Sequence, residues 1–307
     1  MRKTAKDRGV ALITAMLITA MATMVAANLA WDNALDVRRT MVLLHRDQAI
    51  QVALGAESWV ITILHQDLED SQTDHLAEIW ATELPGLPIE GGEVFGAVQD
   101  LQGRFNVNNL IDDNGAVDQE SLEQFRRLLL AIGLDQRFAG VAADWIDSDI
   151  DASFPDGAED SIYTGMLPPY RAPNQTLTSV SELAALDGMD KLTFTALEPH
   201  ITALPGRTEI NVNTATGAVL QSLDENMTLA DVESLIAERE TDGFTDISNT
   251  FSSLVTPDVI NKLQDSTQFF QLKVVVRIDT VRITLVSVLQ RGTNGDVTPI
   301  LRSLGTI

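Results

Sequence analysis

The residues best suited to chemistry are acidic side chains gathered in one short stretch. Seven carboxylates fall within it, and no Lys or Arg occurs between Arg137 and Arg171 to neutralise them: Asp144, Asp147, Asp149, Asp151, Asp156, Glu159 and Asp160. So many negative charges would repel one another in a folded loop, and a hard cation would relieve that repulsion. Ca²⁺ accepts about six to eight oxygen ligands in irregular geometry, whereas Mg²⁺ keeps more of its waters. The stretch therefore predicts a calcium site, with a solvated acidic loop as the alternative.

Three of these aspartates have the spacing of a well-known calcium loop, but the match is incomplete. Asp147, Asp149 and Asp151 repeat the D-x-D-x-D pattern that opens an EF-hand. Such a loop has Gly at its sixth position and Glu at its twelfth, where this chain has Ala152 and Ala158. The stretch is therefore predicted to be a calcium loop of another kind.

No other part of the sequence carries the pattern of a known catalytic or metal centre. The chain has no cysteine, and its four histidines lack a ligand spacing such as H-E-x-x-H. There is no G-x-S-x-G turn, P-loop or G-x-G-x-x-G motif. We therefore predict that the protein is not an enzyme. A membrane-anchored enzyme whose site is assembled only on folding is the alternative.

An uncharged apolar segment near the start predicts the element that anchors the chain. Residues 10–31 contain no charged side chain. As a helix they span roughly 33 Å, enough for a bilayer core of about 30 Å. Four basic residues precede them: Arg2, Lys3, Lys6 and Arg8. Since positive residues stay on the cytoplasmic side, the body of the protein should lie on the opposite side of the membrane. A cleaved secretory signal is the alternative, but the apolar run is longer than such signals usually are.

The membrane helix is predicted to continue into the soluble body. Residues 32–68 contain no Pro, and apolar residues recur at every seventh position: Leu35, Val42, Ala49, Ala56 and Ile63. This period is typical of an amphipathic helix with one apolar seam. We expect the seam to pack on the protein's own sheet and also to face partner subunits.

Two short segments of similar sequence predict a pair of helical modules. Phe105-Asn106-Val107-Asn108 and Ile210-Asn211-Val212-Asn213 share an apolar-Asn-Val-Asn pattern, and helical stretches come after each of them. Asn side chains can bond nearby backbone groups and cap the start of the next helix. The expected helices lie at 121–132, 216–223 and 229–239.

Strands are predicted on both sides of these modules. Residues 94–98 and 103–107 read as early strands, and the Pro-rich run 85–88 is expected to break regular structure. Residues 269–278 and 280–290 are rich in β-branched residues, which favours an antiparallel hairpin. A last strand is expected near 298–304.

Several motifs together resemble one protein family. Lys6-Asp7-Arg8-Gly9, followed by Val10-Ala11-Leu12-Ile13, resembles the leader of type IV pilin-like proteins, in which a prepilin peptidase cuts after Gly and methylates the new N-terminus. Most such proteins have Glu at the fifth mature position, where this chain has Thr14. That departure resembles the K-type minor pseudopilins of the type II secretion system. Four further segments resemble that subfamily's motifs: Asp144-Trp145-Ile146-Asp147, Gly157-Ala158-Glu159-Asp160, Pro169-Tyr170-Arg171 and Ile210-Asn211-Val212-Asn213-Thr214-Ala215.

The resemblance implies an α+β pseudopilin fold, in which a long N-terminal transmembrane and amphipathic helix lies on a small antiparallel sheet. It also implies a large α-helical insertion of two small modules. The expected parts are a leader at 1–9, a membrane segment at 10–31, the first part of the pseudopilin domain at 32–110, the insertion at 111–266 and the C-terminal strands at 267–307. It further implies Ca²⁺ in the acidic loop, with six matching candidate ligands: Asp147, Asp149, Asp151, Asp156, Glu159 and Asp160.

The resemblance also implies a cellular role. Prepilin peptidase would cut between Gly9 and Val10, and the mature chain would be a single-pass inner-membrane protein with its body in the periplasm. It would sit at the tip of a pseudopilus with the I-, J- and H-type minor pseudopilins, help to start assembly, and contact secreted substrates. The alternative is a helix-hairpin-helix DNA-binding protein, because residues 210–215 resemble such modules. The formal net charge of −23 argues against this alternative and predicts no nucleic-acid partner.

Overall fold

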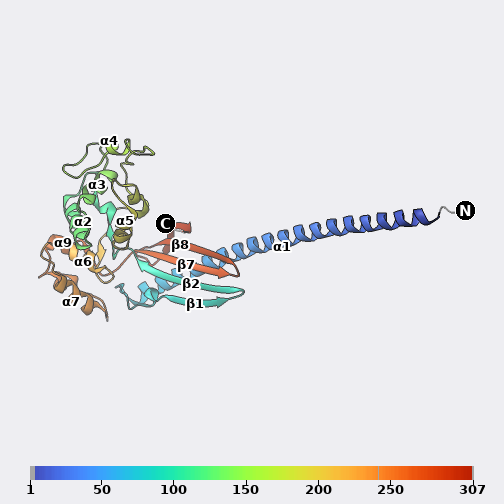
Figure 1. Ribbon diagram of the computed structural model, residues 1–307. Coiled ribbons are helices and arrows are strands. Elements are labelled where there is room, and N and C mark those ends of the chain that lie inside the picture. The colour runs from blue at the N-terminus through green and yellow to red at the C-terminus, as the bar shows by residue number, and fades with distance from the viewer. Residues whose placement is uncertain (1–3, 241, 306–307) are drawn as a thin grey trace.

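The structure is a computed structural model that describes residues 4–240 and 242–305, the side chains of Thr4–Arg8 excepted. The first three residues of the predicted leader therefore lie outside the described part of the chain. One long helix, a five-stranded sheet and a set of shorter helices make up the molecule (Figure 1).

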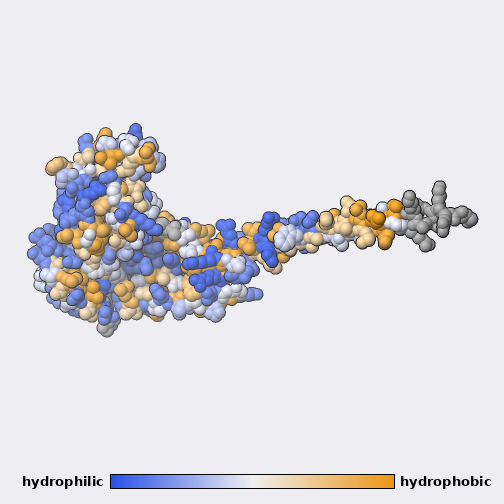
Figure 2. Space-filling model, viewed as in Figure 1, coloured by the Kyte–Doolittle hydropathy of each residue, from blue (hydrophilic) through white to orange (hydrophobic). Residues whose placement is uncertain are grey.

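Helix α1 runs without interruption from Thr4 to Asp70. At about 1.5 Å per residue this is roughly 100 Å, and its N-terminal half projects away from the body as a free rod (Figure 1). Among the described residues, α1 alone is long and apolar enough to cross a membrane. Figure 2 shows apolar residues along the outer part of the rod and charged residues nearer the body. The prediction of one continuous helix is confirmed.

The sheet is antiparallel throughout and has the order β1-β2-β7-β8-β9. Its strands are β1 (Leu84–Ile89), β2 (Gly92–Asp100), β7 (Phe269–Ile278), β8 (Val281–Arg291) and β9 (Val297–Leu304). The predicted hairpin is confirmed, and Asp279 makes its tight turn with a φ of 50°. Alternate residues of the central strands point toward α1, while the opposite face of the sheet is not covered by that helix.

Two predictions about the early strands were wrong in detail. The run 85–88, expected to break regular structure, forms most of β1. Proline cannot donate a ladder hydrogen bond, but β1 is an edge strand, where one side needs no donors. The predicted strand at 103–107 is reduced to β3 (Phe105–Asn106), which pairs outside the main sheet.

The chain leaves the sheet at Asp100 and returns to it at Phe269, and the residues between form two modules. The first contains β3, η2 (Val107–Leu110), α2 (Gln119–Ala131), α3 (Arg137–Ile146), α4 (Asp160–Tyr163), η3 (Val180–Ala185), α5 (Lys191–Leu197), η4 (Glu198–His200) and β4 (Ile201–Thr202). The second contains β5 (Ile210–Asn211), α6 (Gly217–Ser222), α7 (Leu229–Arg239), α8 (Ile247–Phe251), α9 (Pro257–Ile260) and β6 (Leu263–Gln264). The three predicted helices correspond to α2, α6 and α7.

The two modules share one design. In each, a two-residue strand that begins the module pairs in parallel with a two-residue strand that ends it: β3 with β4, and β5 with β6. Asn106 and Asn211 occupy equivalent places and are both buried. Each accepts a hydrogen bond from the backbone N–H two residues later, at 3.2 Å and 3.0 Å. The predicted repeat is therefore present in three dimensions.

The two largest apolar cores hold most of the molecule together. One fills the space between the two modules and includes the stacked rings of Phe105 and Phe125, whose centroids lie 5.1 Å apart. The other lies between α1 and the sheet. A short 3₁₀ helix, η1 (Ile79–Ala81), closes one end of this second core with the buried ring of Trp80.

The predicted seam of α1 only partly matches the face that packs on the sheet. Of its five residues, Ala49 is fully buried, Ala56 and Ile63 are half-buried, and Leu35 and Val42 lie outside the sheet contact. The core between α1 and the sheet begins at Ala49, so Leu35 and Val42 precede the contact. A strict seven-residue repeat also drifts around a straight helix of 3.6 residues per turn. The face that packs instead follows steps of about four residues and includes the fully buried Ala53.

Candidate functional site

Two helices frame the acidic loop. The last turn of α3 carries Asp144, and Asp147 caps the end of that helix. Glu159 caps the start of α4, where its side chain accepts a hydrogen bond from the N–H of Asp160 at 3.3 Å. The two ends of the intervening loop therefore lie close together.

An aromatic contact fixes the two helices against each other. The ring of Trp145 on α3 meets the ring of Tyr163 on α4 edge to face, with centroids 4.9 Å apart. Both rings are buried. The contact holds the two ends of the loop together.

Three of the six predicted ligands converge. Oxygen atoms of Asp147, Asp149 and Glu159 all lie within 4.8 Å of one another. Asp147 and Glu159 are each only 3% exposed, whereas Asp149 lies at the surface. Burial raises the pKa of Asp147 to about 7, and the neighbouring carboxylates Asp149, Asp144 and Glu159 contribute to that rise. Burial likewise raises the pKa of Glu159. Without a bound cation, the deprotonated forms of these two carboxyl groups are therefore disfavoured.

Buried oxygens without partners mark the interior of this group. Among the described residues, Asp144 Oδ1, Asp147 Oδ1 and Glu159 Oε1 are buried and accept no hydrogen bond. The second oxygen of Asp144 accepts a hydrogen bond from the N–H of Ser153 at 2.9 Å. A buried carboxylate oxygen left unpaired costs free energy, and hard cations are the usual partners of such a set. The donor set therefore fits Ca²⁺.

Gly157 is required by the way the loop folds back. A Cβ at this position would lie 2.2 Å from Asp144 Oδ2 and 2.3 Å from the backbone N of Ser153. No other residue type could bring the loop so close to the carboxylate.

Asn174 is a candidate that the sequence did not indicate. It lies well after the acidic stretch, and its backbone has a φ of 48°. Its Nδ2 donates to the backbone carbonyl of Asp149, and its Oδ1 is buried without a hydrogen-bond partner. A neutral amide oxygen is a common calcium ligand. No spacing in the sequence links this Asn to the aspartates, so only the fold brings it to the loop.

The other three predicted ligands lie outside the convergent group. Asp151 is exposed. Asp156 lies 3.9 Å from a guanidinium nitrogen of Arg126. Asp160 accepts a hydrogen bond from the N–H of Ala172 at 3.2 Å. Their assignment as ligands stays a prediction.

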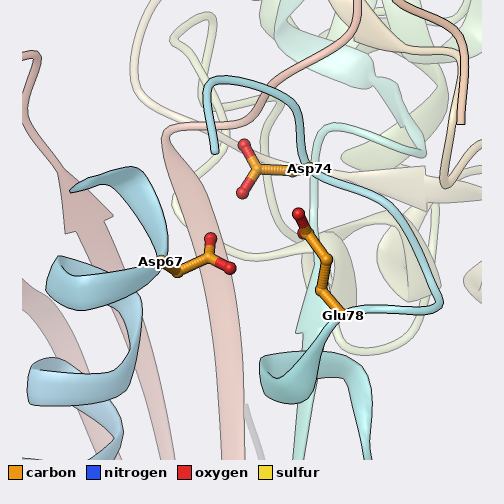
Figure 3. A group of neighbouring side chains, drawn as sticks. All are labelled: Asp67, Asp74 and Glu78. Atoms are coloured by element: carbon orange, nitrogen blue, oxygen red, sulfur yellow. The ribbon is translucent and has the colours of Figure 1, made fainter. Parts of the chain in front are cut away.

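A second group of carboxylates lies where α1 meets the insertion, and here a side chain supplies the cation. Asp67 from the end of α1, Asp74 from the following loop and Glu78 point toward one another (Figure 3), with oxygens within 4.8 Å. Arg291 from β8, itself buried, donates to Asp67 Oδ2 at 3.0 Å and to Asp74 Oδ1 at 2.6 Å. Sequence reasoning missed this group because Arg291 lies more than 200 residues from its partners.

This second group joins the insertion to the sheet domain. Asp74 Oδ2 accepts a hydrogen bond from the N–H of Thr267 at 2.6 Å, and its backbone carbonyl accepts one from Asn211 Nδ2 at 3.1 Å. Burial and the nearby carboxylates Glu78 and Asp74 raise the pKa of Asp67 to about 7. The group acts as a structural joint.

The predicted processing site lies on the free part of α1, together with the first two residues of the predicted partner face, Leu35 and Val42. Gly9 and Val10 are exposed on the helix. The hydroxyl of Thr14 donates to the backbone carbonyls of Val10 and Ala11 at 3.1 Å and 3.0 Å. Its hydrogen-bonding capacity is thus met within its own helix.

Comparisons with known proteins agree on one family. Two family models described as "Type II secretion system (T2SS), protein K" match residues 103–206 and 210–268, which together cover more than half of the chain. The boundary between them separates the two modules seen in the structure. A type II secretion system protein K from Pseudomonas aeruginosa is 34% identical over 97% of this chain and 93% of its own length. The protein K of Aeromonas hydrophila is 27% identical over 98% of each.

The fold matches a solved structure. A chain in the crystal structure of the GspK-GspI-GspJ complex from the enterotoxigenic Escherichia coli type 2 secretion system superposes with a TM-score of 0.78 and 24% identity. The match covers 88% of this chain and 100% of that one. It confirms the α+β pseudopilin fold, and the sequence matches show that the chain belongs to the type II secretion system protein K family.

Proposed function

We propose that this protein is the minor pseudopilin at the tip of a type II secretion pseudopilus, where it helps to start assembly and the export of folded proteins across the outer membrane. One observation carries the proposal. The insertion is attached at the end of the sheet farthest from the membrane segment of α1 (Figure 1). A further subunit added above this one would collide with that bulk, whereas subunits below it would not.

The chemistry of Thr14 supports the same position. In pilin-like stacks the Glu at this place is thought to pair with a neighbour's N-terminal amine. An unpaired charge inside a membrane is costly, but the Thr14 hydroxyl already bonds the carbonyls of its own helix. A subunit at the tip has no neighbour above it, so a neutral residue is suited to that place.

The proposal includes processing and location. Prepilin peptidase would cut between Gly9 and Val10 and methylate the new N-terminus. The mature chain would be held in the inner membrane by residues 10–31, with its body in the periplasm. Mass spectrometry of the mature protein tests this, and an N-terminus upstream of Val10 would contradict it.

The proposed partners are the I-, J- and H-type minor pseudopilins, together with secreted substrates. The outer half of the predicted seam supports a helix-to-helix contact. Val42 is 47% exposed, and neither Val42 nor Leu35 takes part in the core between α1 and the sheet. These two apolar side chains are available to a neighbouring helix.

Calcium is the proposed cofactor of the acidic loop. Asp144, Asp147, Asp149 and Glu159 would hold it, and Asn174 would supply a neutral oxygen. Bound Ca²⁺ would neutralise the buried carboxylates and stiffen the connection between α3 and α4. The protein would act as an assembly component and not as an enzyme.

Copurification tests the proposed assembly. The full chain in detergent micelles should retain the I- and J-type minor pseudopilins of the same organism. Leu35→Glu combined with Val42→Glu should release them, because a carboxylate would replace each apolar contact. Leu43→Glu is the matched control, since Leu43 is 60% exposed but lies off the seam. Failure of the wild-type chain to retain either partner would contradict the proposal.

A further inference from the structure

The face of the sheet that points away from α1 is basic, although the chain as a whole carries a formal net charge of −23. On β7, the even-numbered residues Leu272, Val274 and Val276 pack toward α1. Lys273 lies between them and points to the other side, where it is exposed. Positive residues on one face of a strongly acidic protein form a local site for negative charge.

A groove lies between this face and the first module of the insertion. It consists of two hollows of about 350 Å³ and about 190 Å³. The two hollows share four lining residues, Arg104, Glu198, Gln271 and Lys273, and therefore adjoin each other. We call the two adjoining hollows the sheet-face groove.

Two cations in the groove make no ion pair within the described part of the chain, although the carboxylate of Glu198 lines the same groove. Among the described residues, the Lys273 ammonium makes no ion pair and no side-chain hydrogen bond. The half-buried guanidinium of Arg104 bonds the amide oxygen of Gln99 at 2.7 Å but makes no ion pair within 4.0 Å. Burial lowers the pKa of Arg104, and the nearby carboxylates of Asp100 and Glu198 partly oppose that shift. Lys262 of the insertion, by contrast, pairs with Glu120 at 2.6 Å.

The rest of the lining indicates what the cations would bind. The narrower hollow adds four apolar side chains on its floor: Leu101, Val286, Val288 and Leu301. Gln99 and Gln271 add amide groups next to the cations. A ligand that complements this surface needs a carboxylate for the cations, peptide-like groups for the amides and an apolar side chain for the floor. An extended acidic polypeptide segment has all three.

The position of the groove argues against the lipid of the anchoring membrane as this ligand. Gln48 on α1 contacts the β1–β2 turn through the carbonyl of Glu90. From Trp31 to Gln48 the helix rises about 25 Å, and β2 adds about 23 Å more before Gln99. The groove thus lies roughly 50 Å beyond the membrane segment. Free phosphate would leave the apolar floor uncovered.

We propose that the sheet-face groove binds an extended, carboxylate-bearing segment of a partner protein, with Lys273 and Arg104 holding the carboxylate and the floor holding an apolar side chain. This goes beyond the proposed function, because it assigns a recognition surface remote from both the α1 seam and the calcium loop. The partner's segment would lie along β7 on the open side of the sheet.

A peptide pool tests the proposal on the full chain in detergent micelles. The probe is a pool of hexapeptides made of Glu, Asp, Leu and Val, and immobilised protein should retain acidic peptides with adjacent apolar residues at low salt. Lys273→Glu should lower retention about tenfold, since it replaces an attractive contact by a repulsive one. Arg282→Glu is the matched control and should change retention less than about twofold. Arg282 is exposed on β8, but it does not line the groove.

Three results would overturn the proposal. The first is equal retention by the wild type and by Lys273→Glu, with both melting at the same temperature. The second is equal loss in Lys273→Glu and Arg282→Glu, which would indicate a diffuse charge effect. The third is full displacement of the peptides by inorganic phosphate, or binding of phosphatidylglycerol vesicles that is lost in the same variant, which would identify a simple anion site.

Discussion

The buried carboxyl of Asp147 provides a direct test of the proposed calcium site. The side chain is 3% exposed, and Oδ1 has no hydrogen-bond partner among the described residues. Replacing it with Asn keeps the shape and removes the charge. In the chelated protein Asp147→Asn should therefore be more stable than the wild type, and in calcium it should lose the stabilisation that the wild type gains.

The magnitude follows from the proton affinity of the group. The pKa of Asp147 rises from 3.8 to about 7 on folding, chiefly because of burial. A raised folded pKa gives stability that is fully present below pH 3.8 and is lost as the pH rises through about 7. A tenfold change in proton affinity is worth about 1.4 kcal/mol, so the charged group opposes folding at pH 8 by about 4 kcal/mol at most. Allowing for relaxation of the loop, we expect Asp147→Asn to gain about 2 kcal/mol.

Thermal unfolding of the full chain in detergent micelles measures this effect. For a domain of this size, about 2 kcal/mol corresponds to a rise of roughly 5 °C in Tm. Chelator at pH 8 should show the gain, and the difference between wild type and variant should shrink toward pH 4. Excess Ca²⁺ should raise the wild-type Tm and leave the variant nearly unchanged. Asp151→Asn is the matched control, because Asp151 is exposed and lies outside the convergent group.

Two outcomes would refute the reasoning. If Asp147→Asn destabilised the chelated protein, its carboxylate would have a partner that the geometry does not show. If Ca²⁺ raised the Tm of Asp147→Asn and of the wild type equally, the ion would bind elsewhere. A calcium response lost in Asp151→Asn instead would return the exposed aspartates to the ligand set.

Three further predictions concern other parts of the molecule. Arg291→Leu should lower the unfolding free energy by about 3–5 kcal/mol in denaturant titration, because it leaves Asp74 buried and unpaired, whereas Lys262→Ala should cost less than about 1 kcal/mol. Gly157→Ala should destabilise the chain by about 2 kcal/mol and abolish the calcium response, because its Cβ would collide with Asp144. The control Gly55→Ala, which has open space around it on α1, should stabilise the chain by about 0.5–1 kcal/mol. The pKa of Asp67 is raised from 3.8 to about 7, so the wild type should lose stability relative to Asp67→Asn as pH rises through that window in saturating Ca²⁺.

Local patterns in the sequence predicted the elements that depend on interactions between residues close together in the chain. The helix at 229–239 has the predicted bounds, because Thr228 and Asp231 form a capping box at its start. The β7–β8 turn follows from an Asp in the left-handed region, which Asp tolerates better than most residues. The length of α1 follows from the absence of helix breakers.

Features that depend on pairing between distant residues could not be predicted in this way. The Pro-rich run 85–88 indicates a break in regular structure, and the sequence alone does not reveal that it forms an edge strand, where Pro is tolerated. The partners of Arg291 lie on another element altogether. For the acidic loop, sequence proximity placed six candidate carboxylates together. Only folding shows that Asp147, Asp149 and Glu159 converge and that Asn174 bonds the backbone of Asp149.

The duplicated module explains how the insertion can carry the acidic loop without disturbing the sheet. Each module is closed by a parallel pair of two-residue strands next to a buried Asn, so its two ends meet at its base. The second module is bonded to the sheet domain through Asn211, which donates to the carbonyl of Asp74 and to Asp100 Oδ2. The acidic loop belongs to the first module and begins after α3, away from those contacts. Ion binding that orders this loop should therefore stiffen the first module. The register of β7 against β2 should not change.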